Sequence, residues 1–263
     1  MGRALTNIFR PNKSLTGQAW TILLVVQAVA FLAAWTLGDA FSIPGPYEVL
    51  KAIVRLIKED GLLYELGGSL RINLEAILLS TCISLGLGYF TVLPVARPIV
   101  ELCSKARFFS LTGFITVFTF AFGGGHWLKV SLLTFGMSVF FVTSMASVVA
   151  SIPKSEWDQS RTLRMGDWRS VWENVVLGKA DEAFEMLRQN AAIAWMMLTM
   201  VEGLVRSEGG IGGIMLASAK YRQFDAVFAV QIVVLLVGIA QDQGIAYLKS
   251  LLCPYASLIL ERQ

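Results

Sequence analysis

The stretch WLKVSLLTFGMSVFFVTSMASVVA, from Trp127 to Ala150, carries one charged side chain, Lys129, and ends shortly before Pro153. The hydrocarbon core of a membrane is about 30 Å thick, and a helix needs about 20 predominantly apolar residues to cross it. The stretch reaches that length without a proline inside it. It therefore predicts a helix that spans a lipid bilayer.

The composition of the whole chain agrees with that prediction. Its 263 residues are 55% hydrophobic and 16% charged, and the mean hydropathy is +0.62. Soluble domains carry about 25% charged residues. The composition predicts an integral membrane protein, and we expect an all-α fold. The formal net charge of +3 is too small to indicate nucleic-acid binding, so no nucleic acid is expected as a partner.

Five further segments resemble the first in composition, which gives six predicted transmembrane helices. In chain order these are residues 17–37, 72–93, 108–122, 127–150, 189–205 and 226–247. Between the first two spans, residues 46–66 place apolar side chains among charges at helical spacing. A helix there can lie on the membrane surface or cover the outer rim of the bundle, and both interpretations stay open.

The lysines and arginines predict the orientation. If the N-terminus is cytoplasmic, the inner segments hold 14 of these residues and the outer segments hold 8. Cytoplasmic loops carry the excess of basic residues, so both termini are expected in the cytoplasm. The first span is interpreted as a retained helix, because no small-residue cleavage motif accompanies it.

Residues 151–190 form a polar, tryptophan-rich segment between the fourth and fifth spans. Trp157, Leu163 and Trp168 lie on a helical period with a break near Gly166, which predicts two short helices joined by a turn. Such a pair can be a linker anchored by its tryptophans at the membrane interface. It can equally be a docking element whose apolar face seats on a partner. The periodicity favours neither interpretation.

Motifs for catalysis or metal binding are missing from the sequence. It has no GxxxxGK[ST] phosphate loop, no HExxH zinc motif and no Ser-His-Asp constellation. His126 is the only histidine, which excludes a multi-histidine metal site. Cys82, Cys103 and Cys253 lack paired spacing. The chain is not expected to be an enzyme, and no cofactor or metal is expected in it.

Polar residues inside the predicted spans are the candidates for a transport pathway. An acidic side chain at a helix centre costs about 2.5–3.5 kcal/mol on insertion scales, so it should face the bundle interior. Glu202 can pair with Arg206, one turn later, or line a pathway. Structural pairing is expected for Asp242. Ser110 and Thr116 recur at helical spacing on the third span, where they can line a pathway or bond a neighbouring helix.

The polar segment resembles a known motif. The stretch DQSRTL, Asp158–Leu163, resembles EAARTL in the cytoplasmic "EAA" loop of permease subunits from binding-protein-dependent ABC importers, and NVVLG, Asn174–Gly178, resembles its KVVLP. Arg161, Thr162 and Leu163 match that pattern. The departures are Asp158 for Glu, Gln159 and Ser160 for two alanines, a glycine that comes two positions late at Gly166, and Gly178 for proline.

The resemblance covers about residues 69–257. Residues 69–89 are similar to the first core helix of the family, and residues 200–229 to its fifth helix and the loop after it. Residues 238–257 resemble the last helix and tail of the nitrate, sulfonate and taurine branch. The third span departs from that branch, because Ser110 and Thr116 stand where it commonly has prolines.

The resemblance implies a type I ABC importer permease-like fold in the bacterial cytoplasmic (inner) membrane. Residues 1–68 would hold the N-terminal tail, first helix and outer amphipathic segment, residues 69–257 the permease core with coupling loop 151–190, and residues 258–263 a tail. The implied partners are ABC ATPase subunits that bind ATP and Mg, a second permease subunit expected to be identical, an extracytoplasmic solute-binding protein and membrane lipid.

The resemblance also assigns roles to particular residues. Those expected to couple the chain to the ATPase are Trp157, Asp158, Ser160, Arg161, Thr162, Leu163, Gly166 and Trp168. The pathway candidates are Ser110, Thr116 and Glu202, and the cargo is expected to be a small anion such as nitrate, a sulfonate, taurine or bicarbonate. The alternatives are a self-sufficient secondary transporter or channel, which often shows internal repeats not visible in this sequence, and a membrane-embedded enzyme, which would need a polar catalytic cluster.

Overall fold

The computed structural model describes residues 17–37, 44–205 and 209–254, and within these ranges the chain is helical without strands. This confirms the all-α prediction for the described residues. The elements are α2 (Gly17–Leu37), α3 (Pro46–Lys58), α4 (Leu62–Phe90), α5 (Arg97–Lys105), a 3-10 turn η1 (Ala106–Phe108), α6 (Leu111–Phe122), α7 (His126–Ala150), α8 (Lys154–Thr162), α9 (Asp167–Val171), a π-helical turn η2 (Trp172–Leu177), α10 (Ala180–Leu204), α11 (Ile211–Lys220) and α12 (Phe224–Leu252).

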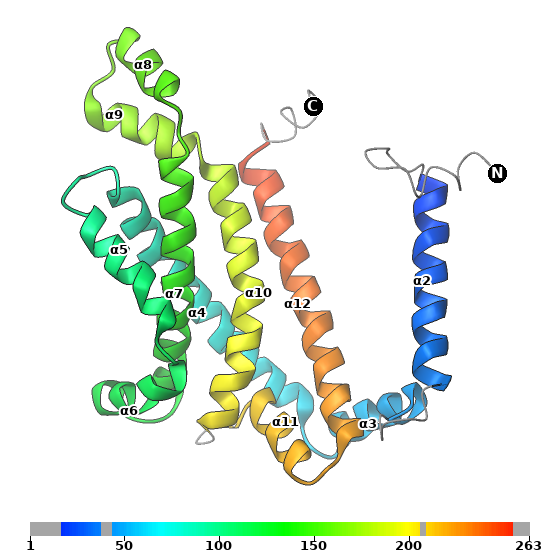
Figure 1. Ribbon diagram of the computed structural model, residues 1–263. Coiled ribbons are helices and arrows are strands. Elements are labelled where there is room, and N and C mark those ends of the chain that lie inside the picture. The colour runs from blue at the N-terminus through cyan, green and yellow to red at the C-terminus, as the bar shows by residue number, and fades with distance from the viewer. Residues whose placement is uncertain (1–16, 38–43, 206–208, 255–263) are drawn as a thin grey trace.

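The long helices form a bundle with two distinct ends (Figure 1). Helix α4 packs most extensively against α7, which also packs against α10, and α10 packs against α12. At one end, called the hairpin end, lie α8 and α9 together with the start of α2 and the end of α12. At the opposite end, called the α11 end, lie α3 and α11. Helix α2 stands apart from the bundle, and 6% of its apolar window is buried.

Among the described residues, four helices are long and apolar enough to cross a membrane, namely α2, α4, α7 and α12. They correspond to four of the six predicted spans, and α2 matches its prediction at both ends. Helix α6 has 12 residues, which at 1.5 Å per residue is about 18 Å, shorter than a hydrocarbon core. Helix α10 has 25 residues but opens with Asp181 and Glu182. The count of six spans therefore stays a prediction.

Two helices begin about ten residues earlier than predicted. Helix α4 starts at Leu62, directly after Gly61, whose φ of 62° ends the preceding segment. Ser69 and Ile72 lie on the same buried stripe as Leu62, so packing holds the helix continuous across this region. Helix α10 starts at Ala180 and runs unbroken to Leu204, with Asp181 and Glu182 in its first turn, where negative charge stabilises the start of a helix.

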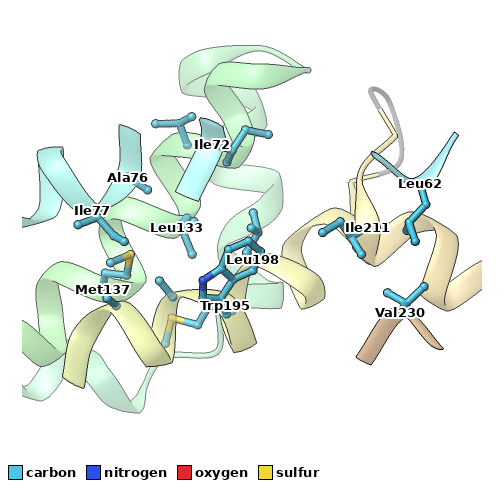
Figure 2. Packing of buried hydrophobic residues seen from close by; sticks show 14 of the residues in the cluster. Leu62, Ile72, Ala76, Ile77, Leu133, Met137, Trp195, Leu198, Ile211 and Val230 are labelled. Carbon is cyan, nitrogen blue, oxygen red and sulfur yellow. The ribbon is translucent and has the colours of Figure 1, made fainter. Parts of the chain in front are cut away.

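The apolar core joins α3, α4, α7, α10, α11 and α12. Figure 2 shows its centre, where Trp195 and Leu198 of α10 lie near Leu133 of α7. Toward the α11 end, Leu62, Ile211 and Val230 form a second part of the same cluster. Because these side chains come from helices far apart in sequence, the core fixes the positions of the polar groups on those helices.

Helix α3 covers the bundle at the α11 end. Its Val49, Ala52 and Leu56 are buried, and it packs against α12. Arg55 Nη2 lies 3.3 Å from Asp225 Oδ2 at the start of α12. Within this chain, α3 thus covers one end of the bundle with its buried face.

Candidate functional site

Helices α8 and α9 form a hairpin that extends beyond the bundle (Figure 1). Helix α7 ends at Ala150, and Pro153, in extended conformation, caps the start of α8. Gly166 is the N-cap of α9, also extended. The prediction of two short helices with a break near Gly166 is confirmed. This segment is called the α8–α9 hairpin below, and it includes the π turn η2.

Arg164 lies two residues before Gly166, at the position where the EAA pattern that this segment resembles has its glycine. It adopts a φ of 54°, in the left-handed region that favours glycine. Its N–H donates to the Arg161 carbonyl (3.0 Å), and the Met165 N–H donates to the Ser160 carbonyl (3.1 Å), which is the hydrogen-bond pattern of a Schellman motif. An arginine therefore makes the helix-ending turn where that pattern has a glycine.

Ser160 and Asn174 are joined by hydrogen bonds between α8 and η2. Ser160 is 4% exposed, and its hydroxyl accepts a hydrogen bond of 2.9 Å from Asn174 Nδ2. The same amide lies 3.4 Å from the Glu156 carbonyl oxygen. Ser160 stands where the motif that this segment resembles has alanine, and Asn174 where that motif has lysine. Together they join α8 to η2, so these hydrogen bonds hold the root of the hairpin.

Gly178 is required by the π turn. Its N–H donates to the Glu173 carbonyl, five residues earlier, at 2.9 Å. A Cβ added at Gly178 would lie 2.7 Å from the Asn174 carbonyl oxygen. Proline has no N–H to donate and carries a Cβ, so it does not fit this turn. One residue later, a hydrogen bond of 2.7 Å to Glu182 raises the pKa of the Lys179 ammonium.

The hairpin exposes large apolar side chains. Leu163 is 61% exposed, Trp168 70% and Trp172 57%. Trp157 differs, because it is half-buried and lines a cavity with Arg97 of α5 and Val149 of α7. Of the three predicted apolar contacts, two are therefore exposed, whereas Trp157 is half-buried beside the cavity between the hairpin and the bundle.

The remaining predicted coupling residues have minor structural roles within the chain. Asp158 Oδ1 and Arg161 Nη1 are 3.7 Å apart and highly exposed, so their ion pair contributes little. Thr162 Oγ1 donates to the Gln159 carbonyl of its own helix. Asp158 and Arg161 thus remain available to another molecule.

A buried polar cluster lies at the α11 end. It is called the Glu202 cluster and consists of Glu65 and Ser69 of α4, Lys129 of α7, Glu202 of α10 and the backbone of residues 209–212. Glu202 is fully buried; Ser69 Oγ donates to its Oε1 at 2.6 Å, and the Gly212 N–H donates to its Oε2 at 3.0 Å. The Gly210 N–H donates to Glu65 at 2.5 Å. The predicted partner Arg206 lies outside the described residues.

Lys129 is the residue of this cluster that sequence reasoning missed. It is fully buried, and its Nζ donates to the Gly209 carbonyl at 2.7 Å. It is the one charged side chain in the apolar stretch Trp127–Ala150. An ionisable residue within a span is by default a candidate for an internal contact, and that signal was sufficient to single it out.

The glycine run after α10 fits closely around these carboxylates. Gly210 has a φ of 111°, and an added Cβ would lie 2.4 Å from the Glu202 carboxyl carbon. At Gly212 the added Cβ would lie 2.1 Å from the Thr199 carbonyl oxygen. The run thus allows the close backbone approach expected of glycine, and α11, which was not predicted, begins within it, at Ile211 directly after Gly210.

A second polar cluster, the Arg188 cluster, lies toward the hairpin end between α10 and α12. Arg188 Nε donates to Asp242 Oδ1 at 2.6 Å, and its Nη2 donates to Oδ2 at 2.9 Å. This confirms the structural pairing expected for Asp242. Next to it, Gln241 Oε1 accepts hydrogen bonds from Trp195 Nε1 (2.9 Å) and Asn73 Nδ2 (2.8 Å).

The three pathway candidates do not form one site. Ser110, the N-cap of α6, and Thr116, on α6, are both exposed, and Ser110 Oγ lies 2.5 Å from Thr112 Oγ1. Glu202 is buried among α4, α10 and α11 with its own hydrogen-bond partners. A pathway role for Ser110 and Thr116 stays a prediction.

In comparisons with known proteins, the chain is similar to proteins of ABC transporters. No protein-family model matches the chain. It is 26% identical over 136 residues to a Methanocaldococcus jannaschii protein that is named as an ABC transporter permease. That alignment covers 47% of this chain and 51% of the relative, so the chain spans about half the length of the relative it matches. A chain from a solved structure of the MetNI methionine ABC transporter, in inward-facing conformations, superposes with a TM-score of 0.55.

The structural likeness covers 74% of this chain and 99% of the solved chain at 15% sequence identity. At that identity it establishes a shared fold. The shared fold and the four apolar helices together describe a multi-pass membrane protein.

Proposed function

We propose that this chain is the membrane-spanning permease subunit of an ABC importer in the bacterial cytoplasmic membrane. Its cargo is a small solute of the kind carried by the nitrate, sulfonate and taurine branch. Six spans cross the membrane, α6 and α10 contributing two of them, and both termini and the α8–α9 hairpin are cytoplasmic. The observation that carries this proposal is the hairpin, whose exposed Leu163 and Trp168 project beyond a bundle with the fold of a known ABC transporter chain.

The hairpin has the mechanical properties that coupling requires. Its root is held by Ser160, Asn174 and the π turn closed at Gly178. It is covalently continuous with α7 on one side and α10 on the other. A displacement of the exposed face would therefore move both helices, because packed elements shift as rigid bodies rather than deform continuously.

Two features indicate the partners of the chain, namely a sequence without a phosphate-binding loop and the exposed apolar side chains of the hairpin. Its sequence holds no phosphate-binding loop, so ATP and Mg bind to separate ATPase subunits. The apolar side chains of the hairpin seat in a groove of the ATPase, as helix-in-groove recognition does elsewhere. A second copy of the chain completes the pathway, and an extracytoplasmic solute-binding protein delivers the cargo at the α11 end.

Co-purification of an ATPase tests this proposal. The tagged chain is purified in mild detergent from its native membrane, and partners are identified by mass spectrometry and by ATP hydrolysis. We expect a subunit with a phosphate-binding loop to co-purify with the native chain and with Leu50→Asp, but not with Leu163→Asp. Leu50, on α3 at the other end, is 62% exposed and matches Leu163 at 61%. Transport by the purified chain alone would instead establish a self-sufficient transporter.

A further inference from the structure

A groove of about 1050 Å³ lies at the α11 end, between α3 and the turn that joins α11 to α12. Helix α3 supplies most of one wall, and Arg222, Phe224 and Asp225 supply the other. We propose that this groove binds the phosphate of an anionic phospholipid at the membrane surface, while the acyl chains of that lipid lie against α3. The inference goes beyond the permease assignment, because neither the α8–α9 hairpin nor the pathway candidates take part in it.

Helix α3 has two apolar faces, and the bundle buries one of them. Val49, Ala52 and Leu56 form the buried face. The second face consists of exposed side chains that recur at three- and four-residue steps, namely Tyr47, Leu50, Val54 and Ile57. A surface helix in water carries polar residues on its outward face. A second apolar face that is exposed therefore indicates contact with hydrocarbon or with a partner, and it is called the α3 stripe below.

The position of α3 favours lipid as the neighbour of the α3 stripe. Helix α3 follows α2 in the chain and packs against α12, and both of these helices are apolar enough to cross a membrane (Figure 1). Tyr47 on α3 and Tyr221 just before α12 are both exposed, and tyrosine is enriched where a membrane meets water. An amphipathic helix with cations on its polar face lies in that interface, with its apolar face among the acyl chains.

The groove carries a surplus of one positive charge. Its charged side chains are the basic Lys51, Arg55, Lys58 and Arg222 and the acidic Glu48, Glu59 and Asp225. Arg55 Nη2 lies 3.3 Å from Asp225 Oδ2, so these two charges are paired. Glu48 accepts a hydrogen bond of 3.1 Å from the Gly45 N–H. The phosphodiester of a phospholipid has one negative charge, which matches the surplus, and its oxygens accept charge-assisted hydrogen bonds.

Three of the basic side chains are available to bind such a phosphate. Lys51, Lys58 and Arg222 are exposed, and their charged groups form no hydrogen bond or ion pair within the described part of the chain. Lys51 and Lys58 directly follow Leu50 and Ile57, so cations border the α3 stripe. Lysine can keep its stem on apolar surface while its ammonium reaches the polar layer. Arg222 has a φ of 56°, a conformation in which glycine is less strained, so its backbone does not explain why an arginine stands there.

Fluorescence quenching by brominated lipids tests the proposal. In a background with Cys82, Cys103 and Cys253 replaced by Ser, Leu50→Cys is labelled with bimane. The full chain, with its co-purifying partners, is reconstituted into vesicles of phosphatidylcholine and phosphatidylglycerol. One of the two lipids is brominated in each series, so the quenching reports which lipid lies beside the label. The matched control is Val26→Cys, because Val26 is 60% exposed and Leu50 62%, and its helix α2 carries no charged residue.

We expect a preference for the anionic lipid only at the groove. Beside Leu50→Cys, phosphatidylglycerol should bind about fivefold more tightly than phosphatidylcholine, as a basic residue near an anionic lipid allows. Beside Val26→Cys, the two lipids should quench equally. Arg222→Gln should remove most of the preference at Leu50→Cys. Lys220→Gln should leave it unchanged, because Lys220 is exposed two residues earlier but does not line the groove.

Three results would overturn the inference. Absence of quenching at Leu50→Cys and at a second label site, Val54→Cys, would show that protein or water covers α3. Equal binding of the two lipids, or equal losses with Arg222→Gln and Lys220→Gln, would show that the groove does not select a head group. Reversal of the quenching by inorganic phosphate would show a site for free phosphate instead of lipid. The thermal unfolding midpoint of each variant is compared with that of the native chain, so that loss of folding is recognised.

Discussion

The two ends of the bundle both carry polar groups in an apolar chain, and they treat them in opposite ways. In the α8–α9 hairpin, Leu163 and Trp168 are exposed and the hydrogen bonds lie at the root. In the Glu202 cluster, Glu202 and Lys129 are fully buried, and backbone and side-chain groups satisfy them. Exposed large apolar side chains of this kind are typical of surfaces that contact another protein or a membrane. Buried charges with partners inside the chain indicate that the α11 end is held by the fold itself.

The largest effect in testing this contrast between the two ends of the bundle is expected at Lys129, in the buried Glu202 cluster. Lys129→Met removes the hydrogen bond to the Gly209 carbonyl and the attractive electrostatic interaction with Glu202. It leaves a buried carboxylate without its cation, which typically destabilises a protein by about 3–5 kcal/mol. We expect a large fall in the thermal unfolding midpoint in detergent. The control Lys51→Met, at an exposed position of α3, should change stability by less than about 0.5 kcal/mol; equal effects would contradict the buried-cluster interpretation.

The next effect in size concerns the glycines that enclose the cluster. Gly210→Ala places a Cβ against the Glu202 carboxylate at a φ of 111°, and strain of this kind costs about 1–3 kcal/mol. Gly213→Ala is the matched control, because the nearest atom to its added Cβ is 4.0 Å away. In that helical position alanine should be neutral or stabilising, by up to about 1 kcal/mol. The measurement is the thermal unfolding midpoint of both variants in the same detergent, which should fall for Gly210→Ala and not for Gly213→Ala.

At the hairpin end, Asn174→Ala should have a smaller and more local effect. It removes the bonds to Ser160 and to the Glu156 carbonyl, and a typical hydrogen bond contributes about 0.5–1.5 kcal/mol. Hydrogen exchange should accelerate in residues 154–178 and stay unchanged in α4. In a double-mutant cycle with Ser160→Ala, the two changes should not be additive. Additive effects would show that Ser160 and Asn174 do not act together.

The difference between the hairpin and the Glu202 cluster also explains which features the sequence could predict and which it could not. The long apolar helices are visible in composition, and α2 was placed correctly at both ends because its flanks change character abruptly. The start of α4 was missed because Gly67 and Gly68 weaken a helix by only about 1 kcal/mol each, and packing of Leu62 and Ser69 outweighs that loss. Apolar composition thus predicted where the long helices lie, but it predicted the residues at which they begin and end less accurately.

The polar contacts were harder to predict because their partners are distant in sequence. Ser69 and Glu202 are 133 residues apart, and Arg188 and Asp242 are 54 apart. Sequence reasoning placed Glu202 in the interior but offered Arg206 as its partner, since only the neighbour at helical spacing was visible. The hairpin was predicted in more detail because its contacts are local, spanning 14 residues between Ser160 and Asn174.

The smallest predicted effect is a gain of stability at Arg164. This arginine holds a left-handed conformation with a φ of 54°, which is less favourable than a right-handed one by about 1–2 kcal/mol for a residue with a Cβ. Arg164→Gly should relieve part of that strain and stabilise the hairpin, so that hydrogen exchange in α8 slows. Arg161→Gly, inside α8, should do the reverse by about 1 kcal/mol. Opposite signs at two exposed arginines three residues apart would show that backbone conformation, not charge, sets the stability of the hairpin.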